Sequence, residues 1–303
     1  MTPSSPTSVA MPRPLPILGI GVVPFDSYAE AVKCAEDAIA AGRKTFWVAV
    51  NPEKIHTAMK DSRLRAVLEQ ADAGLCDGIG VALAARLLHG RVVKRCTGCD
   101  LFFHLIARAA EAGWRVFLLG ASPESNERAC ASLTARYPSL KIAGRQHGYF
   151  EDSQEVVRAI NESRAEVVFV AMGSPKQEFW IAEHRQAIAA PFCMGVGGAF
   201  DVASGIAKRA PRFFQKTGTE YLYQLVARPG WTIGVRWERT LARLRFFGAV
   251  IRAALGGHGT AEPEGHCADG TAAERASTPS WPWQEVASQG RIEGTHGDKH
   301  TTT

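Results

Sequence analysis

A cation, an amide and a carboxylate stand side by side directly after an apolar run of the chain. They are Lys176, Gln177 and Glu178, and the run covers residues 167–172. Its β-branched and aromatic residues are typical of a buried parallel strand, and Pro175 stands where a helix can begin without a backbone donor. Open α/β sheets bind ligands, phosphorylated ones in particular, at such strand ends. We therefore expect an exposed loop end where Lys176 contacts phosphate and the other two side chains hydrogen-bond a ligand; a polar first helical turn is the alternative.

A second carboxylate is placed for acid–base chemistry. Asp77 follows the short apolar segment 74–76 and precedes Gly78 and Gly80, whose missing side chains let a ligand approach the backbone. A carboxylate held at a strand end can remove a proton from a hydroxyl group. The same position also suits an aspartate that caps the following helix, and the residues alone leave the two roles open.

Other strand ends add candidate binding residues. Arg95 can offer a planar fork to a diphosphate, although a solvated arginine is as compatible with the pattern. The backbone amides of Gly197 and Gly198 can contact a nucleotide, and Asp201 can reach a hydroxyl of a ribose or sugar, or cap the next helix. Asn51 ends an earlier strand and is expected at the same edge of the sheet.

The elements that position these residues alternate between strands and helices. Such alternation predicts an α/β fold, a Rossmann-like, mostly parallel sheet covered by helices on both faces. The expected strands are 17–23, 45–50, 74–76, 115–119, 141–143, 167–172 and 191–196, and the expected helices are 27–41, 53–59, 63–70, 80–88, 100–112, 123–137, 153–164 and 175–188.

The character of the chain changes after this α/β region. Residues 201–252 hold ten basic and three acidic residues, a net charge of +7 against +5 for all 303 residues. Aromatic and aliphatic residues are interspersed, and the segment 236–254 has a helical pattern, so it suits an anionic membrane interface; a solvated basic helix is the alternative. We expect a disordered terminus at 1–16, an α/β core at 17–200, an appendage at 201–255 and a disordered tail at 256–303.

Cysteine usage and the termini favour a cytoplasmic location. Seven scattered cysteines do not form a secreted disulfide framework. Cys96 and Cys99 form a C-x-x-C pair without a second pair or neighbouring histidines, so we interpret them as incidental rather than metal-binding or redox-active. The amino terminus lacks the apolar core of a signal peptide, and no stretch is apolar enough to predict a transmembrane helix.

Three segments together resemble one protein family. They are Gly173-Ser-Pro-Lys-Gln-Glu178; Cys76-Asp-Gly-Ile-Gly-Val81 with Arg95-Cys-Thr-Gly-Cys-Asp-Leu101; and Gly195-Val-Gly-Gly-Ala-Phe-Asp201 with Lys208-Arg-Ala-Pro211. In this order and spacing they resemble the WecG/TagA/CpsF family of bacterial glycosyltransferases, over roughly residues 17 to 245.

The resemblance implies an inverting, metal-independent transferase without a cofactor. Its donor would be a UDP-sugar and its acceptor a polyprenyl-diphosphate-linked sugar used for cell-surface polysaccharide. Asp77 would be the catalytic base and Gln177 would hold a sugar. The appendage would dock at the inner face of the plasma membrane and contribute arginines to the diphosphate site, with Arg228, Arg236 and Arg239 as the candidates. Neither the transferred sugar (N-acetylmannosamine and glucose both fit) nor self-association follows from the sequence.

Other function classes fit the sequence less well. A nucleotide-dependent oxidoreductase would show a complete G-x-G-x-x-G after its first strand. A membrane-docked nucleotide-binding scaffold shares every feature except catalysis, so only an assay separates it from the transferase. Nucleic-acid binding is disfavoured because the positive charge accompanies apolar residues rather than a recognisable module.

Overall fold

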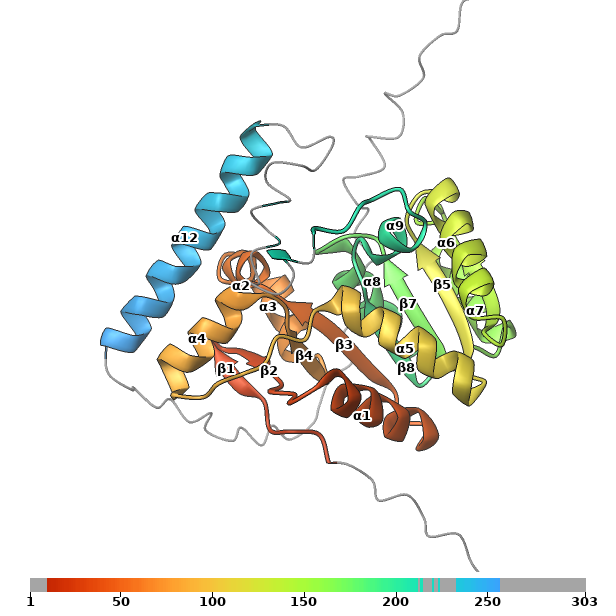
Figure 1. Ribbon diagram of the computed structural model, residues 1–303, viewed down its shortest axis with the longest axis horizontal. Coiled ribbons are helices and arrows are strands. Elements are labelled where there is room, and N and C mark those ends of the chain that lie inside the picture. Colours follow the sequence, from red (N-terminus) through yellow and green to blue (C-terminus); the bar gives the residue numbers. More distant parts are fainter. Residues whose placement is uncertain (1–9, 212, 215–219, 221–222, 224–232, 257–303) are drawn as a thin grey trace, which may run out of the picture. The chain divides into compact units, whose positions relative to one another are not determined.

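The computed structural model describes residues 10–211, 213, 214, 220, 223 and 233–256, which all belong to one compact unit ending at Gly259. Its centre is a six-stranded, entirely parallel sheet in the order β4-β3-β8-β7-β5-β6 (Figure 1). The strands are β3 (Thr45–Val50), β4 (Ala73–Cys76), β5 (Arg115–Gly120), β6 (Lys141–Gln146), β7 (Val167–Ala171) and β8 (Phe192–Gly195). The predicted α/β class and parallel sheet are therefore confirmed.

The expectation of a first strand at 17–23 is wrong. That segment contributes to a separate antiparallel hairpin of β1 (Leu15–Ile17) and β2 (Ile20–Val22). Leu18 and Gly19 both have positive φ angles, 50° and 88°, and so reverse the chain in the middle of the apolar run. The hairpin meets the sheet at its edge, where the Val23 amide donates to the Gly74 carbonyl at 2.8 Å.

Helices cover both faces of the sheet because strand side chains alternate between two cores. Trp47 packs on one side, with α1 (Tyr28–Ala40), α5 (Gly98–Ala112), α6 (Pro123–Arg136) and α9 (Ala199–Ala203). The neighbouring Phe46 and Val48 pack on the other side. There the cover consists of α2 (Pro52–Ala58), α3 (Ser62–Glu69), α4 (Ile79–His89), α7 (Ser153–Glu162) and α8 (Lys176–His184).

Local signals set most helix boundaries. The side chains of Ser27, Asn51 and Thr97 cap α1, α2 and α5 by accepting hydrogen bonds from backbone amides of the first turn. Gly90 and Gly113, both left-handed, end α4 and α5. The structure lengthens the predicted strand 141–143, shortens the helix 175–188 and adds α9, which the sequence did not predict.

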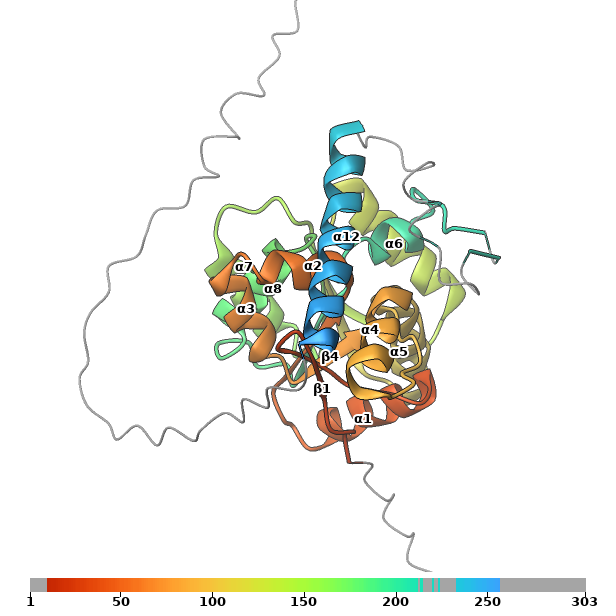
Figure 2. The same ribbon diagram turned by 90° about the vertical axis from the view of Figure 1, so that its left-hand side faces the viewer.

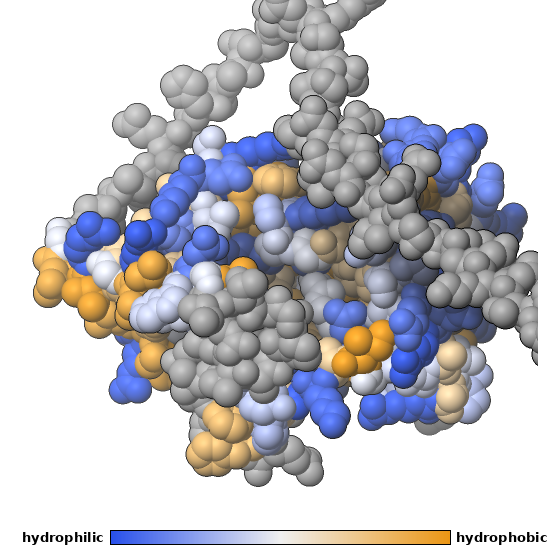
Figure 3. Space-filling model, turned by 90° about the horizontal axis from the view of Figure 1, so that it is seen from above, coloured by the Kyte–Doolittle hydropathy of each residue, from blue (hydrophilic) through white to orange (hydrophobic). Residues whose placement is uncertain are grey.

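The predicted basic helix is α12 (Ile233–Leu255), which packs across α2 and α4 (Figures 1 and 2). Phe246 and Val250 are its buried anchors, while Trp237 and Leu244 are each 62% exposed. Figure 3 shows apolar side chains gathered on the left, where α12 lies. Among the described residues, no helix is both long and apolar enough to cross a membrane.

Candidate active site

Two pockets open at the carboxyl edge of the parallel sheet, where ligands of such folds bind. The first, about 340 Å³, lies beyond β3 and β4 and is called the Asp77 pocket; its polar lining is Asn51, Glu53, Asp77, Arg95, Thr97, Glu220, Arg239, Thr240 and Arg243. The second, about 370 Å³, lies beyond β5, β7 and β8 and is called the Lys176 pocket; it is lined by Ala121, Ser122, Gly148, Tyr149, Ala171, Met172, Gly173, Lys176, Gly197, Gly198 and Asp201. The sequence-predicted residues thus fall into two groups.

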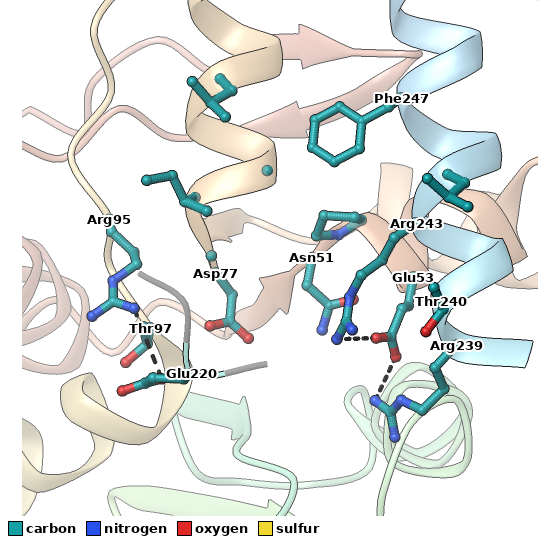
Figure 4. A pocket seen from close by; sticks show the side chains of 16 residues that line it. Asn51, Glu53, Asp77, Arg95, Thr97, Glu220, Arg239, Thr240, Arg243 and Phe247 are labelled. Atoms are coloured by element: carbon teal, nitrogen blue, oxygen red, sulfur yellow. Dashed lines mark ion pairs between the residues drawn. The ribbon is translucent and has the colours of Figure 1, made fainter. Parts of the chain in front are cut away.

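Asp77 is held between a strand and a helix start. Its backbone amide donates to the Val50 carbonyl at 3.0 Å, which ties the ends of β3 and β4 together. Asn51 accepts from the Lys54 amide at 2.9 Å as the α2 cap and also hydrogen-bonds the Asp77 carboxylate. Gly78 follows with φ of 110° and no side-chain cap is made to α4, so the proposed alternative of Asp77 as a helix cap is wrong. The carboxylate points into the pocket (Figure 4).

The environment raises the pKa of Asp77 to about 6. Burial is the main cause, because it penalises the charged form, and Glu220 adds repulsion. Lys54 and Arg95 act in the opposite direction, as does the hydrogen bond from Asn51. A carboxylate with this pKa is ionised at neutral pH and is more basic than an ordinary aspartate, which suits it to accept a proton.

The raised pKa predicts that the charge on Asp77 lowers the free energy of unfolding at neutral pH. The folded protein binds the proton more tightly than the unfolded chain does, so the loss of stability begins as the pH rises above 3.8, the ordinary pKa of an aspartate, and is complete above about 6. We expect Asp77→Asn to raise the free energy of unfolding by roughly 1–3 kcal/mol at pH 8. Denaturant titrations at pH 4 and pH 8 check this, since the gain should largely disappear at the lower pH; an equal gain at both would contradict it.

Arginines and acids form ion pairs around the same pocket (Figure 4). Arg239 and Arg243, one turn apart on α12, both pair with Glu53 in the first turn of α2. Across the pocket, Arg95 lies 3.8 Å from Glu220, which also lies 3.6 Å from Arg209. The arginines at this rim are therefore held in place by carboxylates. A diphosphate that enters the pocket could replace those carboxylates as the partner of the arginines.

An apolar wall completes the Asp77 pocket. Ile79 and Leu83 of α4 face Leu244 and Phe247 of α12 across it. The first three of these side chains are 40–62% exposed. A polar floor carrying Asp77 beneath an apolar, partly open wall suits a ligand with a polar head and a hydrocarbon tail.

The Lys176 pocket lies where the chain paths diverge. From β5 the chain proceeds through α6 to the edge strand β6, whereas from β7 it proceeds through α8 in the opposite direction to β8. The pocket opens between these paths, the usual ligand position in doubly wound sheets. Gly173 and Gly197 have φ of 76° and 54°, so they turn backbone towards the cavity without a side chain in the way.

Charged groups flank this second pocket. Lys176 donates to the Gly148 carbonyl at 3.3 Å, and Asp201 accepts from Ser125 Oγ at 2.7 Å. Lys176 and Asp201 line the pocket together with Gly197 and Gly198, as expected for residues of one ligand edge. A cation, backbone amides and a carboxylate are a set that can bind the phosphates and ribose of a nucleotide.

The expectation of an exposed loop end is wrong for Gln177 and Glu178. Both side chains are buried, at 3% and 0% exposure, because α8 turns them under the sheet edge. Glu178 Oε1 accepts from Lys54 Nζ at 2.7 Å and from Gln177 Nε2 at 2.9 Å, and Gln177 Oε1 accepts from the Gly197 amide at 3.0 Å. These side chains thus bind protein groups beneath the two pockets.

The structure also places the other residues near these motifs. Thr97 caps α5, and Asp100 in the first turn of that helix pairs with Arg209. Arg236 lies on α12, but its side chain is outside the described part of the structure, and Arg228 lies outside the described residues altogether. Burial raises the pKa of Cys99 to about 12 and that of Cys96 further, so both thiols stay protonated.

Sequence reasoning missed several pocket residues. Glu53 follows the Asn51-Pro52 strand end directly, and Arg243 stands four residues after Arg239, so helical spacing could have indicated both. Glu220 has no comparable signal in the sequence around it. Lys54, which is buried and does not line the pocket, was also missed, because a lysine in a helix is ordinarily a surface residue.

Fold and site together define an α/β protein with two adjacent pockets at the carboxyl edge of its sheet, one of which contains the buried carboxylate of Asp77. The chain matches the model of the glycosyl transferase WecG/TagA/CpsF family over residues 15–259 and belongs to that family. The protein is a glycosyltransferase, as the sequence resemblance predicted.

Two known proteins are similar to about two thirds of this chain. A Bacillus spizizenii protein is 38% identical over 207 residues, 68% of this chain and 79% of the relative. A Bacillus subtilis protein is 36% identical over 203 residues, 67% of this chain and 77% of the relative. Each is named N-acetylglucosaminyldiphosphoundecaprenol N-acetyl-β-D-mannosaminyltransferase.

Proposed function

We propose that this glycosyltransferase moves an N-acetylhexosamine of the N-acetylmannosamine class from a UDP-sugar to a polyprenyl-diphosphate-linked N-acetylglucosamine. The observation that carries the proposal is Asp77, a carboxylate with a pKa of about 6 that faces a cavity rimmed by arginines. The names of the two relatives support the acceptor and the sugar. The product would enter a bacterial cell-surface polysaccharide.

The two pockets divide the substrates between them. In the proposal, the UDP moiety occupies the Lys176 pocket, with Lys176 at the phosphates, Asp201 at a sugar or ribose hydroxyl, and the amides of Gly197 and Gly198 beside them. The acceptor sugar and its diphosphate occupy the Asp77 pocket, with Arg95, Arg239 and Arg243 at the charge. The hydrocarbon tail leaves along the apolar wall of α4 and α12.

Transfer is then a single displacement at the anomeric carbon. Asp77 takes the proton of the acceptor hydroxyl, the hydroxyl oxygen forms a bond to the anomeric carbon, and the bond to the UDP oxygen breaks from the opposite face. The configuration inverts, the proton remains on Asp77, and UDP leaves with the electron pair. The proposal includes no metal or cofactor, so activity should persist in EDTA.

The proposed location is the inner face of the plasma membrane. The half-exposed Leu83 and Leu87 of α4 and the exposed Trp237 and Leu244 of α12 form an apolar rim beside basic residues. Such a surface binds anionic lipid interfaces without spanning them. It would bring the pocket to an acceptor anchored in the same membrane.

The test is UDP release from a panel of UDP-sugars, with and without a diphosphate-linked N-acetylglucosamine acceptor. We expect one donor to give acceptor-dependent release, with kcat/KM falling below about pH 6 as Asp77 becomes protonated. UDP release that does not depend on the acceptor would reject the proposal, as would the absence of release from every donor when the protein is folded. Membrane binding without sugar transfer would then favour a scaffold.

A further inference from the structure

A buried cation lies beneath the Asp77 pocket without lining it. Lys54 is on the inner side of α2 and only 6% exposed. Removing a lysine from water is costly unless it meets an opposite charge, and Glu178 supplies one at 2.7 Å. The pair joins two elements that are distant in sequence, α2 and α8, directly under the site.

The anchor of this lysine is itself held rigidly. Glu178 Oε1 also accepts from Gln177 Nε2 at 2.9 Å, and the other end of that amide accepts from the Gly197 amide at 3.0 Å. Gly195 has no room for a side chain, since a Cβ there would lie 2.7 Å from Gln177 Nε2. In the described residues Glu178 Oε2 has no hydrogen-bond partner, so the carboxylate is committed to Lys54 and Gln177 through one oxygen.

The amino-terminal half of α2 is fixed to Asp77 as well. Asn51 accepts from the Lys54 amide and hydrogen-bonds the Asp77 carboxylate, so the same residue places the lysine backbone and the base. Lys54 attracts the negative charge on Asp77 and so lowers the pKa of that carboxyl group. Only burial has a larger effect on the pKa of Asp77. A lysine that was not connected to Asp77 through Asn51 would not be held in place to act on the charge of the base.

We propose that Lys54 is a positioning residue for transfer: a buried cation, anchored by Glu178 and Gln177, that keeps Asp77 in the ionised form able to accept a proton. The inference rests on the proposed role of Asp77 as the base. Because Gln177 also holds Gly197 of the Lys176 pocket, one network supports both substrate pockets. This network explains why a glutamine and a glutamate stand at positions 177 and 178. In this explanation neither side chain contacts the substrate.

Other charges around Asp77 must be held constant in a test. Arg95 attracts the carboxylate and Glu220 repels it. The thiols of Cys76, Cys96 and Cys99 have raised pKa values and are neutral below pH 9. The ion pairs of Glu53 with the α12 arginines complete the charged set. None of these is changed by a substitution at Lys54.

The first experiment measures the pH profile of kcat/KM for Lys54→Met and Lys54→Arg. Removing the charge should move the acidic limb of the profile upward by roughly one pH unit, so activity lost at pH 6.5 returns by pH 9. Lys54→Arg keeps the cation and should leave the limb in place. A uniform loss at every pH would show a merely structural role and overturn the inference.

A second variant protects the test against misfolding. Breaking a buried ion pair leaves an uncompensated charge, whereas replacing both partners is often tolerated. The double variant Lys54→Met/Glu178→Gln should therefore fold better than Lys54→Met. Its acidic limb should still move upward, but by less than in Lys54→Met, because the repulsion of Asp77 by Glu178 is removed together with the attraction by Lys54. An unshifted limb in the folded double variant would also overturn the inference.

A readout without turnover separates this inference from the proposed function. The free energy of unfolding gained on Asp77→Asn at pH 8 is compared in the wild-type and the Lys54→Met/Glu178→Gln backgrounds. The gain should be larger without Lys54, because the charge on Asp77 then lacks the cation that opposes the effect of burial most strongly. Equal gains would reject the role of Lys54 even in an active enzyme, whereas absent sugar transfer with unequal gains would reject only the proposed reaction.

Discussion

Asp77→Asn is expected to lower acceptor-dependent transfer by about 10²–10⁴-fold, the range that a positioned general base contributes. The asparagine has nearly the same shape and fits the pocket, but it cannot take the proton of the acceptor hydroxyl. Since Asp77 does not line the Lys176 pocket, the dissociation constant for UDP should not change. Initial rates of UDP release and calorimetric titration with UDP measure the two quantities separately.

Asp201→Asn provides a matched control for this substitution. It makes the same chemical change in the other pocket, where Asp201 accepts from Ser125. We expect a higher KM for the donor and an acidic limb that still falls near pH 6, because the base is intact. Near wild-type turnover in a folded Asp77→Asn protein would show that Asp77 is not the base. A shift of the acidic limb in Asp201→Asn would indicate that Asp201 is the base instead.

Much of the fold follows from local signals. Apolar runs of five or six residues, such as Thr45–Val50 and Val167–Ala171, predict buried strands. Helix starts are equally legible at Ser27 and Thr97, where a side chain caps the first turn. The hairpin at the amino terminus could not be predicted in this way, because its reversal depends on the positive φ of Leu18, which a leucine rarely adopts.

The position of the site was predictable, but the contacts of its side chains were not. Strand ends predicted Asn51, Asp77, Lys176 and Asp201 at one edge of the sheet, and the structure divides them between two pockets at that edge. The burial of Gln177 and Glu178 depends on a partner 124 residues from Glu178 along the chain, Lys54. A local pattern of polar residues cannot distinguish a carboxylate that faces solvent from one that finds a buried cation on another element.

The charge of the appendage, residues 201–255, is a second case in which the sequence does not reveal the contacts of side chains. Its net positive charge indicates anion binding, yet each arginine of the pocket already pairs with a carboxylate from another element, Glu53 or Glu220. Arginines pre-positioned in this way lose less side-chain freedom when a diphosphate arrives. The arginines of the pocket are therefore accompanied by carboxylate partners, and charge counting along the sequence detects only the excess of positive charge.

Arg239→Gln/Arg243→Gln is expected to raise KM for a diphosphate-linked acceptor by about 10²–10⁴-fold, since two charged hydrogen bonds of about 1.5–3 kcal/mol each are removed. The effect on kcat should be smaller, because neither arginine contacts the leaving UDP in the proposed arrangement. A short-chain, water-soluble acceptor is used, so that altered membrane binding by α12 cannot produce the result. Initial rates against acceptor concentration give KM.

Two further variants decide whether the diphosphate is what these arginines bind. Arg252→Gln removes a cation from the exposed end of the same helix, away from the pocket, and should leave KM for the soluble acceptor unchanged. Glu53→Gln releases both arginines from their carboxylate and should lower KM or leave it unaltered, because it removes a competitor for the same cations. If Glu53→Gln instead raises KM as much as the double arginine variant does, the arginines act by fixing α12 against α2 rather than by binding the acceptor.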